Sequence, residues 1–355
     1  MMISKKILNL IKSNFGIFLF GLLFVILFRD FLYTYRIQLE KFLPYYNYQD
    51  QIMYYLTGDS KYDVQAPMNL RFIGLWVQFL IYKIIPCLEL THTNIILPYS
   101  EYSCVTFSSA LMNYLSLCGI MSVTFSYCYK KLNLNLSESI LTVLFAYIYI
   151  NHVEAFTLDR ISILYFFIIL YFLDNRYLSV ILILFAALVN EKIIFILGGL
   201  FFIRLFFNQK KDFLILFVAT FFSGLIAIGI FLFYSVVLGH GYLESDLGGQ
   251  GLYDTVFSSG PSRILSIFTS KSGLSNGAIP LIFAIIPYLI SFFIKESKFY
   301  FSKFDIVIPI SLLVFTAGGG MEQTGRYVMY SMPLWLPIFS QQILYFVKNK
   351  RQDGK

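Results

Sequence analysis

The residues whose types and spacing could do chemistry lie in short polar segments between long apolar blocks. The first segment, YYNYQDQIMYYLTGDSKYDVQAPMNLRFIGL, contains Asp50, Tyr54 and Arg71. A carboxylate at Asp50 can act as a general base toward a hydroxyl group. Tyrosines such as Tyr54 can stack on sugar rings, and Arg71 can hold a phosphate through two parallel hydrogen bonds. The structural alternative is a loop helix with a solvated carboxylate and packed aromatic rings.

A second segment, Asn190-Glu191-Lys192, interrupts the apolar stretch at residues 178–207. One straight membrane-spanning helix would bury these polar residues at the membrane centre, where charges are costly. Two short helices with the tripeptide at their ends avoid that cost. The sequence therefore predicts a helix break here, and its simplest structural role is a capped break with a local pair between Glu191 and Lys192.

A third segment, GGGMEQTGRYVMYSMP, begins with three glycines that allow close approach to a ligand. It is not a phosphate-binding P-loop, because no Gly-Lys-Ser/Thr follows. Glu322 and Arg326 stand four residues apart before an apolar block, so one interpretation makes Arg326 a membrane-interface anchor paired with Glu322.

A fourth segment contains His152, Glu154 and the dipeptide Asp159-Arg160. The histidine and the glutamate could serve acid–base chemistry or bind a metal, but two ligands are too few to predict a metal site. A hydrogen-bonded loop is the simpler interpretation. No metal and no cofactor are therefore expected.

The composition identifies the environment of these segments. Of 355 residues, 58% are hydrophobic and 13% are charged, against about 25% charged in soluble domains. This excludes a soluble globular protein and also a disordered chain. The apolar residues form long blocks without the alternation of a membrane β-barrel, so we predict an all-α, polytopic helical membrane protein. Basic residues are scattered, which argues against nucleic-acid binding.

The four cysteines show no metal-binding spacing and are interpreted as small apolar side chains. A disulfide between Cys87 and Cys104 would require both to face an oxidising compartment. Nothing in the sequence demands that bond.

Ten apolar blocks predict about ten transmembrane helices in a single membrane domain over residues 1–355. The first follows three lysines and lacks a cleavage site, so it is interpreted as a retained signal anchor. The blocks are residues 15–28, 104–129, 140–150, 161–173, 178–189, 193–207, 213–238, 279–294, 306–317 and 328–347.

The charges between the blocks predict which side each loop faces. With both termini in the cytoplasm, the inner side carries 16 basic and 6 acidic residues, a net charge of +10. The outer side carries 11 basic and 14 acidic residues, a net charge of −3, as the positive-inside rule predicts. The outer loops are residues 29–103, 151–160, 190–192, 239–278 and 318–327.

One apolar stretch, residues 72–87, does not fit this alternation. A full crossing there would place Lys130 and Lys131 on the outer side. We therefore interpret it as an interfacial or re-entrant helix on the outer face. The alternative is a crossing followed by a weak return through residues 95–109.

The first outer loop resembles that of GT-C glycosyltransferases in the spacing of Asp50, Tyr54, Gly58, Pro67 and Arg71. These polytopic enzymes use polyprenyl-linked sugars, and the resemblance implies that Asp50 is the catalytic base. The paired acid usual in that family is absent, because Gln51 follows Asp50. Asp59 and Asp63 are therefore rival bases.

The same resemblance implies roles for the later segments. Lys192 would bind a lipid phosphate with Glu191 as its partner, and Glu322 and Arg326 would open a late helix at a pyrophosphate or sugar. The expected partners are a polyprenyl-linked sugar donor, a glycan acceptor, the lipid bilayer and, as candidates, other polysaccharide-assembly proteins.

The implied function is transfer or polymerisation of polyprenyl-(pyro)phosphate-linked sugars for surface polysaccharide. The implied location is the outer face of a bacterial cytoplasmic (inner) membrane. The sequence does not distinguish a glycosyltransferase from an O-antigen or capsule polymerase. The competing class is a membrane transporter or flippase, for which Asp159-Arg160 and Asn190–Lys192 could begin a polar path.

Overall fold

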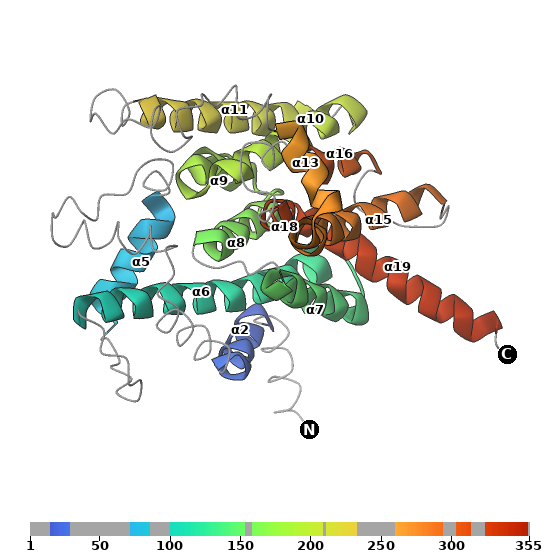
Figure 1. Ribbon diagram of the computed structural model, residues 1–355, viewed down its shortest axis with the longest axis horizontal. Coiled ribbons are helices and arrows are strands. Elements are labelled where there is room, and N and C mark those ends of the chain that lie inside the picture. The colour runs from blue at the N-terminus through green and yellow to red at the C-terminus, as the bar shows by residue number, and fades with distance from the viewer. Residues whose placement is uncertain are drawn as a thin grey trace.

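The computed structural model describes residues 15–28, 72–85, 100–152, 158–208, 211–232, 260–293, 303–313 and 324–353. Within these ranges every regular element is a helix, which confirms the predicted all-α class (Figure 1). Each apolar block of the sequence contains a helix, and most helices extend beyond their block into the flanking polar residues.

The longer helices provide the frame of the molecule. They are α2 (Phe15–Ile26), α5 (Phe72–Ile84), α6 (Ser100–Ser126), α7 (Leu136–His152), α8 (Leu158–Tyr171), α9 (Arg176–Val189), α10 (Glu191–Asn208), α11 (Lys211–Leu232), α13 (Gly260–Thr269), α15 (Ile279–Phe293) and α19 (Met332–Asp353). Short helical segments join them: η3 (Tyr127–Lys131), α14 (Lys271–Gly273), η6 (Leu274–Ala278), η7 (Lys303–Ile306), α16 (Val307–Ser311) and α18 (Thr324–Met329).

Three of the described helical stretches are long and apolar enough to cross a membrane: Phe107–Lys131, Phe213–Ile230 and Lys271–Phe292. They differ in burial, because 83% of the first is buried in the protein but only 22% of the second. The exposed side chains of the second include Phe221 and Phe222, which lipid tails could cover. These three stretches support a membrane protein, whereas the expected total of about ten spans stays a prediction.

The larger of two apolar clusters of buried side chains draws on α6 to α11, α15, α16, α18 and α19. Helix α6 runs through it and packs against α2, α5, α7 and α8 (Figure 1). The crossing of α6 and α8 is close at Gly119, where an added Cβ would lie 2.9 Å from Leu164 Cδ2. A larger residue at that position would require the Leu164 side chain to move.

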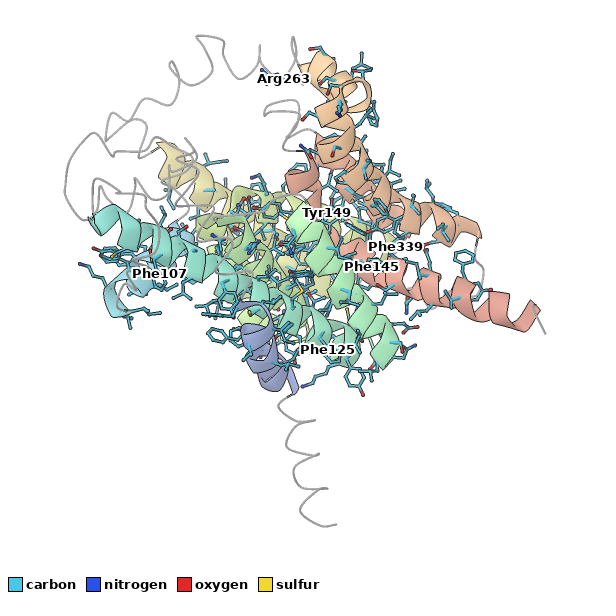
Figure 2. All side chains as sticks on the ribbon, turned by 60° about the horizontal axis from the view of Figure 1, so that its bottom comes forward. Phe107, Phe125, Phe145, Tyr149, Arg263 and Phe339 are labelled. Carbon is cyan, nitrogen blue, oxygen red and sulfur yellow. The ribbon has the colours of Figure 1, made fainter. Side chains whose placement is uncertain are left out.

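Helices α7 and α19 pack through aromatic side chains. Phe145 and Phe339 lie side by side with ring centroids 5.1 Å apart (Figure 2). One turn further along α7, Tyr149 meets Trp335 edge-on at 5.2 Å, and its hydroxyl donates a hydrogen bond to the Gly325 carbonyl at 3.5 Å. This interface fixes α18 and the start of α19 against the end of α7.

Helix α5 crosses the N-terminal part of α6 (Figure 1). Its buried Gln78 donates to the Val105 carbonyl at 3.5 Å, and Leu75 packs against Val105 and Met112. Its 13 residues span about 20 Å, less than the ~30 Å of a bilayer core. Helices α2, α8 and α9 have 12, 14 and 14 residues, so length does not distinguish the interfacial interpretation of this stretch from a crossing.

The N-terminal part of α6 also contains a disulfide-bonded cysteine, Cys104, whereas Cys118 and Cys128 are free and buried. The remaining cysteine of the sequence, Cys87, lies outside the described residues. Disulfides persist in oxidising compartments, so Cys104 is informative about sidedness.

Candidate functional site

The predicted break at the Asn190 tripeptide is confirmed. Asn190 ends α9 in an extended conformation, with φ −170° and ψ 130°, and α10 begins at the next residue. Its backbone N–H donates to the Ala186 carbonyl at 3.0 Å, and its Oδ1 accepts from the Lys192 backbone N–H at 3.1 Å. The asparagine therefore satisfies backbone groups on both sides of the break.

The Asn190 side chain reaches a buried tyrosine from the far end of the chain. Its Nδ2 donates to the Tyr330 hydroxyl at 2.9 Å and lies 3.3 Å from Ser162 Oγ. The Tyr330 hydroxyl in turn donates to Asp159 Oδ1 at 2.6 Å. Three segments that are more than 25 residues apart in sequence thus converge through hydrogen bonds.

Two cationic side chains complete this group. Lys192 Nζ lies over the Tyr330 ring, 5.3 Å from its centroid, and Arg160 Nη2 donates to Asn151 Oδ1 at 3.2 Å. Arg160 is 1% exposed and Lys192 9%, so both charges are almost removed from solvent. We call this set the Asp159 cluster: Asn151, Asp159, Arg160, Ser162, Asn190, Lys192 and Tyr330.

The burial of Asp159, which is 3% exposed, requires compensation for its lost hydration. The short hydrogen bond from Tyr330 provides part of it. Asp159 also lies in the first turn of α8, where the helix dipole stabilises a negative charge. In such a cluster the ammonium and the guanidinium can bind phosphate, and the carboxylate can accept hydrogen bonds from hydroxyl groups.

A second buried charged group lies elsewhere in the bundle. Arg204 Nη2 and Asp305 Oδ2 form an ion pair at 2.5 Å, with side chains 10% and 0% exposed. We call it the Arg204 pair. It joins α10 to η7, and Tyr127 lies within electrostatic reach of both charges. The sequence analysis counted both residues among the charges of the cytoplasmic side, and that count carries no information about their burial.

The two groups lie toward opposite ends of α10. Lys192 and Arg204 both belong to α10 and are separated by about 18 Å of helix. Near the Asp159 cluster, Ile161 packs against Val105 at the start of α6. At the other end, Lys131 after α6 pairs with Asp174.

Most residues that the sequence nominated cannot be placed in the site. Asp50, Tyr54, Arg71 and Glu322 lie outside the described residues, as do the rival bases and the pair of His152 and Glu154 side chains. The side chains of Glu191 and Arg326 also lie outside the description, although α10 and α18 contain their backbones. Lys192 is the one predicted substrate-binding side chain that the description places within the cluster, where it joins Asp159, Arg160 and Asn190 from the other polar segments of the sequence.

Tyr330 was missed by the sequence reasoning. It is one of 27 tyrosines, and no neighbouring residue distinguishes it. One signal existed, because Tyr330 follows Arg326 by four residues, about one helical turn. Arg326, which the sequence analysis selected, thus lies close along the chain to Tyr330, the residue that connects the cluster.

No family model, curated protein or solved structure matches the chain. Among the described residues, no group of three or more His, Cys, Asp or Glu side chains could hold a metal ion.

Proposed function

We propose that the chain is a polytopic protein of the inner (cytoplasmic) membrane with about ten spans and cytoplasmic termini. Two observations from opposite ends of α6 support this orientation. Cys104 is disulfide-bonded, as befits an outer oxidising compartment, and Lys130 and Lys131 follow the helix, as befits the cytoplasm. On this orientation the Asp159 cluster faces the outer leaflet.

Reporter fusions test the orientation directly. Fusions at Lys130, Lys210 and Lys298 should all report a cytoplasmic position. An outer-side signal at Lys130 would mean that residues 72–87 cross the membrane and that every later loop is inverted.

Within this orientation, we propose transfer or polymerisation of polyprenyl-(pyro)phosphate-linked sugars at the outer face, for a surface polysaccharide. One observation carries the proposal: two cations and a carboxylate from distant segments are buried together in the Asp159 cluster. Such groups suit a headgroup that combines phosphate with sugar hydroxyls.

The proposed reaction is the attack of an acceptor hydroxyl on the anomeric carbon of the donor sugar. A carboxylate, assigned to Asp50, takes the proton of the acceptor hydroxyl while its oxygen attacks the sugar anomeric carbon. The bond from that carbon to the phosphate oxygen breaks, and the polyprenyl (pyro)phosphate leaves with the electron pair. Lys192, Arg71 and Arg326 stabilise the charge that develops on it. Tyr54, Glu191 and Glu322 contribute substrate contacts.

Binding of undecaprenyl phosphate by the purified full-length protein in detergent tests the proposal. Lys192→Gln should weaken binding about tenfold or more, since a charge-assisted contact to phosphate is lost. The matched control is Lys131→Gln, which removes an equal charge at the opposite end of the bundle and should bind like the wild type. Equal affinity of all three proteins would overturn the assignment.

A transporter or flippase is the second candidate function, and the Arg204 pair is the observation that favours it. Lys192 and Arg204 are two buried charged side chains on α10, and they could form two binding positions along a polar path through the bundle. Reconstitution in liposomes separates the classes: a transferase extends a lipid-linked glycan when donor and acceptor are supplied, whereas a flippase moves the lipid without changing its mass.

A further inference from the structure

Helix α13 is the most strongly amphipathic of the longer described helices. Its Ile267 is fully buried, whereas Leu265 is 63% exposed and Phe268 is 46% exposed. We propose that α13 lies in the membrane–water interface and anchors its segment to the bilayer, with Leu265 and Phe268 inserted among lipid tails. The inference goes beyond the proposed chemistry and rests only on the proposed membrane location.

The exposed side of α13 has an apolar half and a polar half. Residues three apart on an α-helix are offset by about 60° around its axis. Phe268, Leu265 and the exposed Ser262 therefore follow one another around the helix in steps of about 60°. A helix divided in this way can lie flat on a bilayer, with one half in the lipid tails and the other in water.

The next segment of the chain indicates that lipid covers the apolar half. Helix α13 ends at Thr269, and the stretch Lys271–Phe292, which is long and apolar enough to cross a membrane, begins two residues later. Ser270, between them, is extended with φ −94° and ψ 149°, and α13 and α15 run in different directions (Figure 1). Helix α13 therefore lies where a predicted span meets the membrane surface, and on the proposed topology this is the outer surface.

The bend between α13 and this span is tightly packed. The Gly273 backbone N–H donates to Ser270 Oγ at 2.9 Å, and the Leu274 N–H donates to the Ser270 carbonyl at 2.9 Å. A Cβ at Gly273 would collide with the Ser266 carbonyl oxygen and lie 2.8 Å from the Ile267 Cα. The direction of α13 is thus fixed relative to the span that follows it.

The charge of this segment suits a lipid surface. Residues 260–293 contain two basic residues, Arg263 and Lys271, and no acidic residue. A net positive charge attracts anionic headgroups and adds to the insertion of apolar side chains. Helix α13 also packs against η6, which packs against α18, and Tyr330 directly follows α18. An anchored α13 would therefore connect the lipid surface to the Asp159 cluster.

Spin labels on introduced cysteines measure the depth of each half of α13. Leu265→Cys, Phe268→Cys and Ser262→Cys are made in the full-length protein, labelled, and reconstituted in vesicles of phosphatidylethanolamine and phosphatidylglycerol. Collisions of each label with oxygen, which concentrates in lipid, are compared with collisions with a water-soluble nickel chelate. The protein without an introduced cysteine gives the background from native cysteines.

The ratio of oxygen to nickel collisions should be severalfold higher at positions 265 and 268 than at position 262. All three side chains are exposed, so the substitutions should leave the thermal unfolding temperature unchanged. Equal ratios at the three positions would overturn the inference, because the whole helix would then lie in water or in lipid. Protection of positions 265 and 268 from both reagents would also overturn it, because protein would then cover them.

The matched control is Phe221→Cys on α11, a 60% exposed position within the apolar stretch Phe213–Ile230. Its label should collide mainly with oxygen. A lipid-exposed label at position 221 together with water-exposed labels on α13 would overturn this inference alone. A water-exposed label at position 221 would overturn the proposed membrane location, and this inference with it.

Discussion

The Asp159 cluster and the Arg204 pair show two ways to bury charge in one helical bundle. In the Arg204 pair, the guanidinium contacts the carboxylate directly at 2.5 Å. In the Asp159 cluster, Asp159 accepts a hydrogen bond from the Tyr330 hydroxyl, and Lys192 lies over the ring of the same tyrosine. The first arrangement joins two segments through one ion pair, and the second gathers charged and neutral polar side chains from several segments around one tyrosine.

This difference separates a structural role from a ligand-binding role. A closed ion pair in an apolar environment fixes two segments together, and here it attaches η7 to α10. A larger group of charged and neutral polar side chains offers several contacts to a ligand that combines phosphate with hydroxyl groups. We therefore expect variants at one end to affect activity and variants at the other to affect stability.

The largest effect on activity is expected from Asp50→Asn, which keeps the size of the side chain and removes the basic oxygen. Loss of a general base typically lowers a rate about 10²–10⁴-fold. Surface glycan should fall below detection or shorten to single units, as judged by gel electrophoresis of extracted polysaccharide, with normal protein levels.

Asp59→Asn and Asp63→Asn are the controls and should keep most activity. Loss of polymer in either of them, together with full polymer in Asp50→Asn, would move the base without changing the enzyme class. If all three variants are fully active, the glycosyltransferase proposal loses its main support in the sequence and the transporter class takes precedence.

The largest effect on stability is expected from Arg204→Leu. It leaves the fully buried Asp305 carboxylate without the guanidinium that it contacts. Breaking a buried pair in this way typically costs about 3–5 kcal/mol, so yield and the thermal unfolding temperature in detergent should both fall. Combining it with Asp305→Leu should recover most of the loss, because no buried charge remains.

A different result at the Arg204 pair would break the comparison. If Arg204→Leu keeps its unfolding temperature but abolishes lipid movement in liposomes, the pair belongs to a transport path. The transporter proposal would then explain both buried groups.

The sequence predicted the helices and the break between α9 and α10 because both depend on local patterns. Long apolar blocks must form helices in a membrane, and a polar tripeptide within one must lie at a helix end. The partners of Tyr330 lie 140 and 171 residues away, and local spacing contains no information about such contacts.

The Arg204 pair shows a related limit. Its residues are 101 positions apart, and counting charges for the positive-inside rule treats them as independent flanking groups. Whether such a charge faces solvent or a partner depends on how the helices pack. Packing is a property of the folded bundle, which no count of loop charges includes.

An intermediate effect is expected from Arg326→Lys, which keeps the charge but loses the planar fork of the guanidinium. Arg326→Ala should abolish glycan product at near-normal protein level, and the lysine variant should also be poor. Product yield from complemented cells measures both. Full activity of Arg326→Lys would reduce the residue to an interface anchor and restrict the ligand-binding region to the Asp159 cluster.

The smallest effect is expected at a charged pair at the same end of the bundle as the Arg204 pair. Lys131 Nζ lies 2.6 Å from Asp174 Oδ2, but the two side chains are 31% and 78% exposed. Water already solvates such charges, so the pair should contribute no more than about 1 kcal/mol. Lys131→Ala also removes a cation–π contact to Tyr171 at 5.3 Å, yet it should barely shift the unfolding temperature.

Asp174→Asn should likewise barely shift the unfolding temperature, and raised salt should abolish any remaining difference from the wild type. A loss as large as that of Arg204→Leu would mean that burial does not distinguish the two pairs, and stability could then no longer be assigned to the Arg204 pair alone.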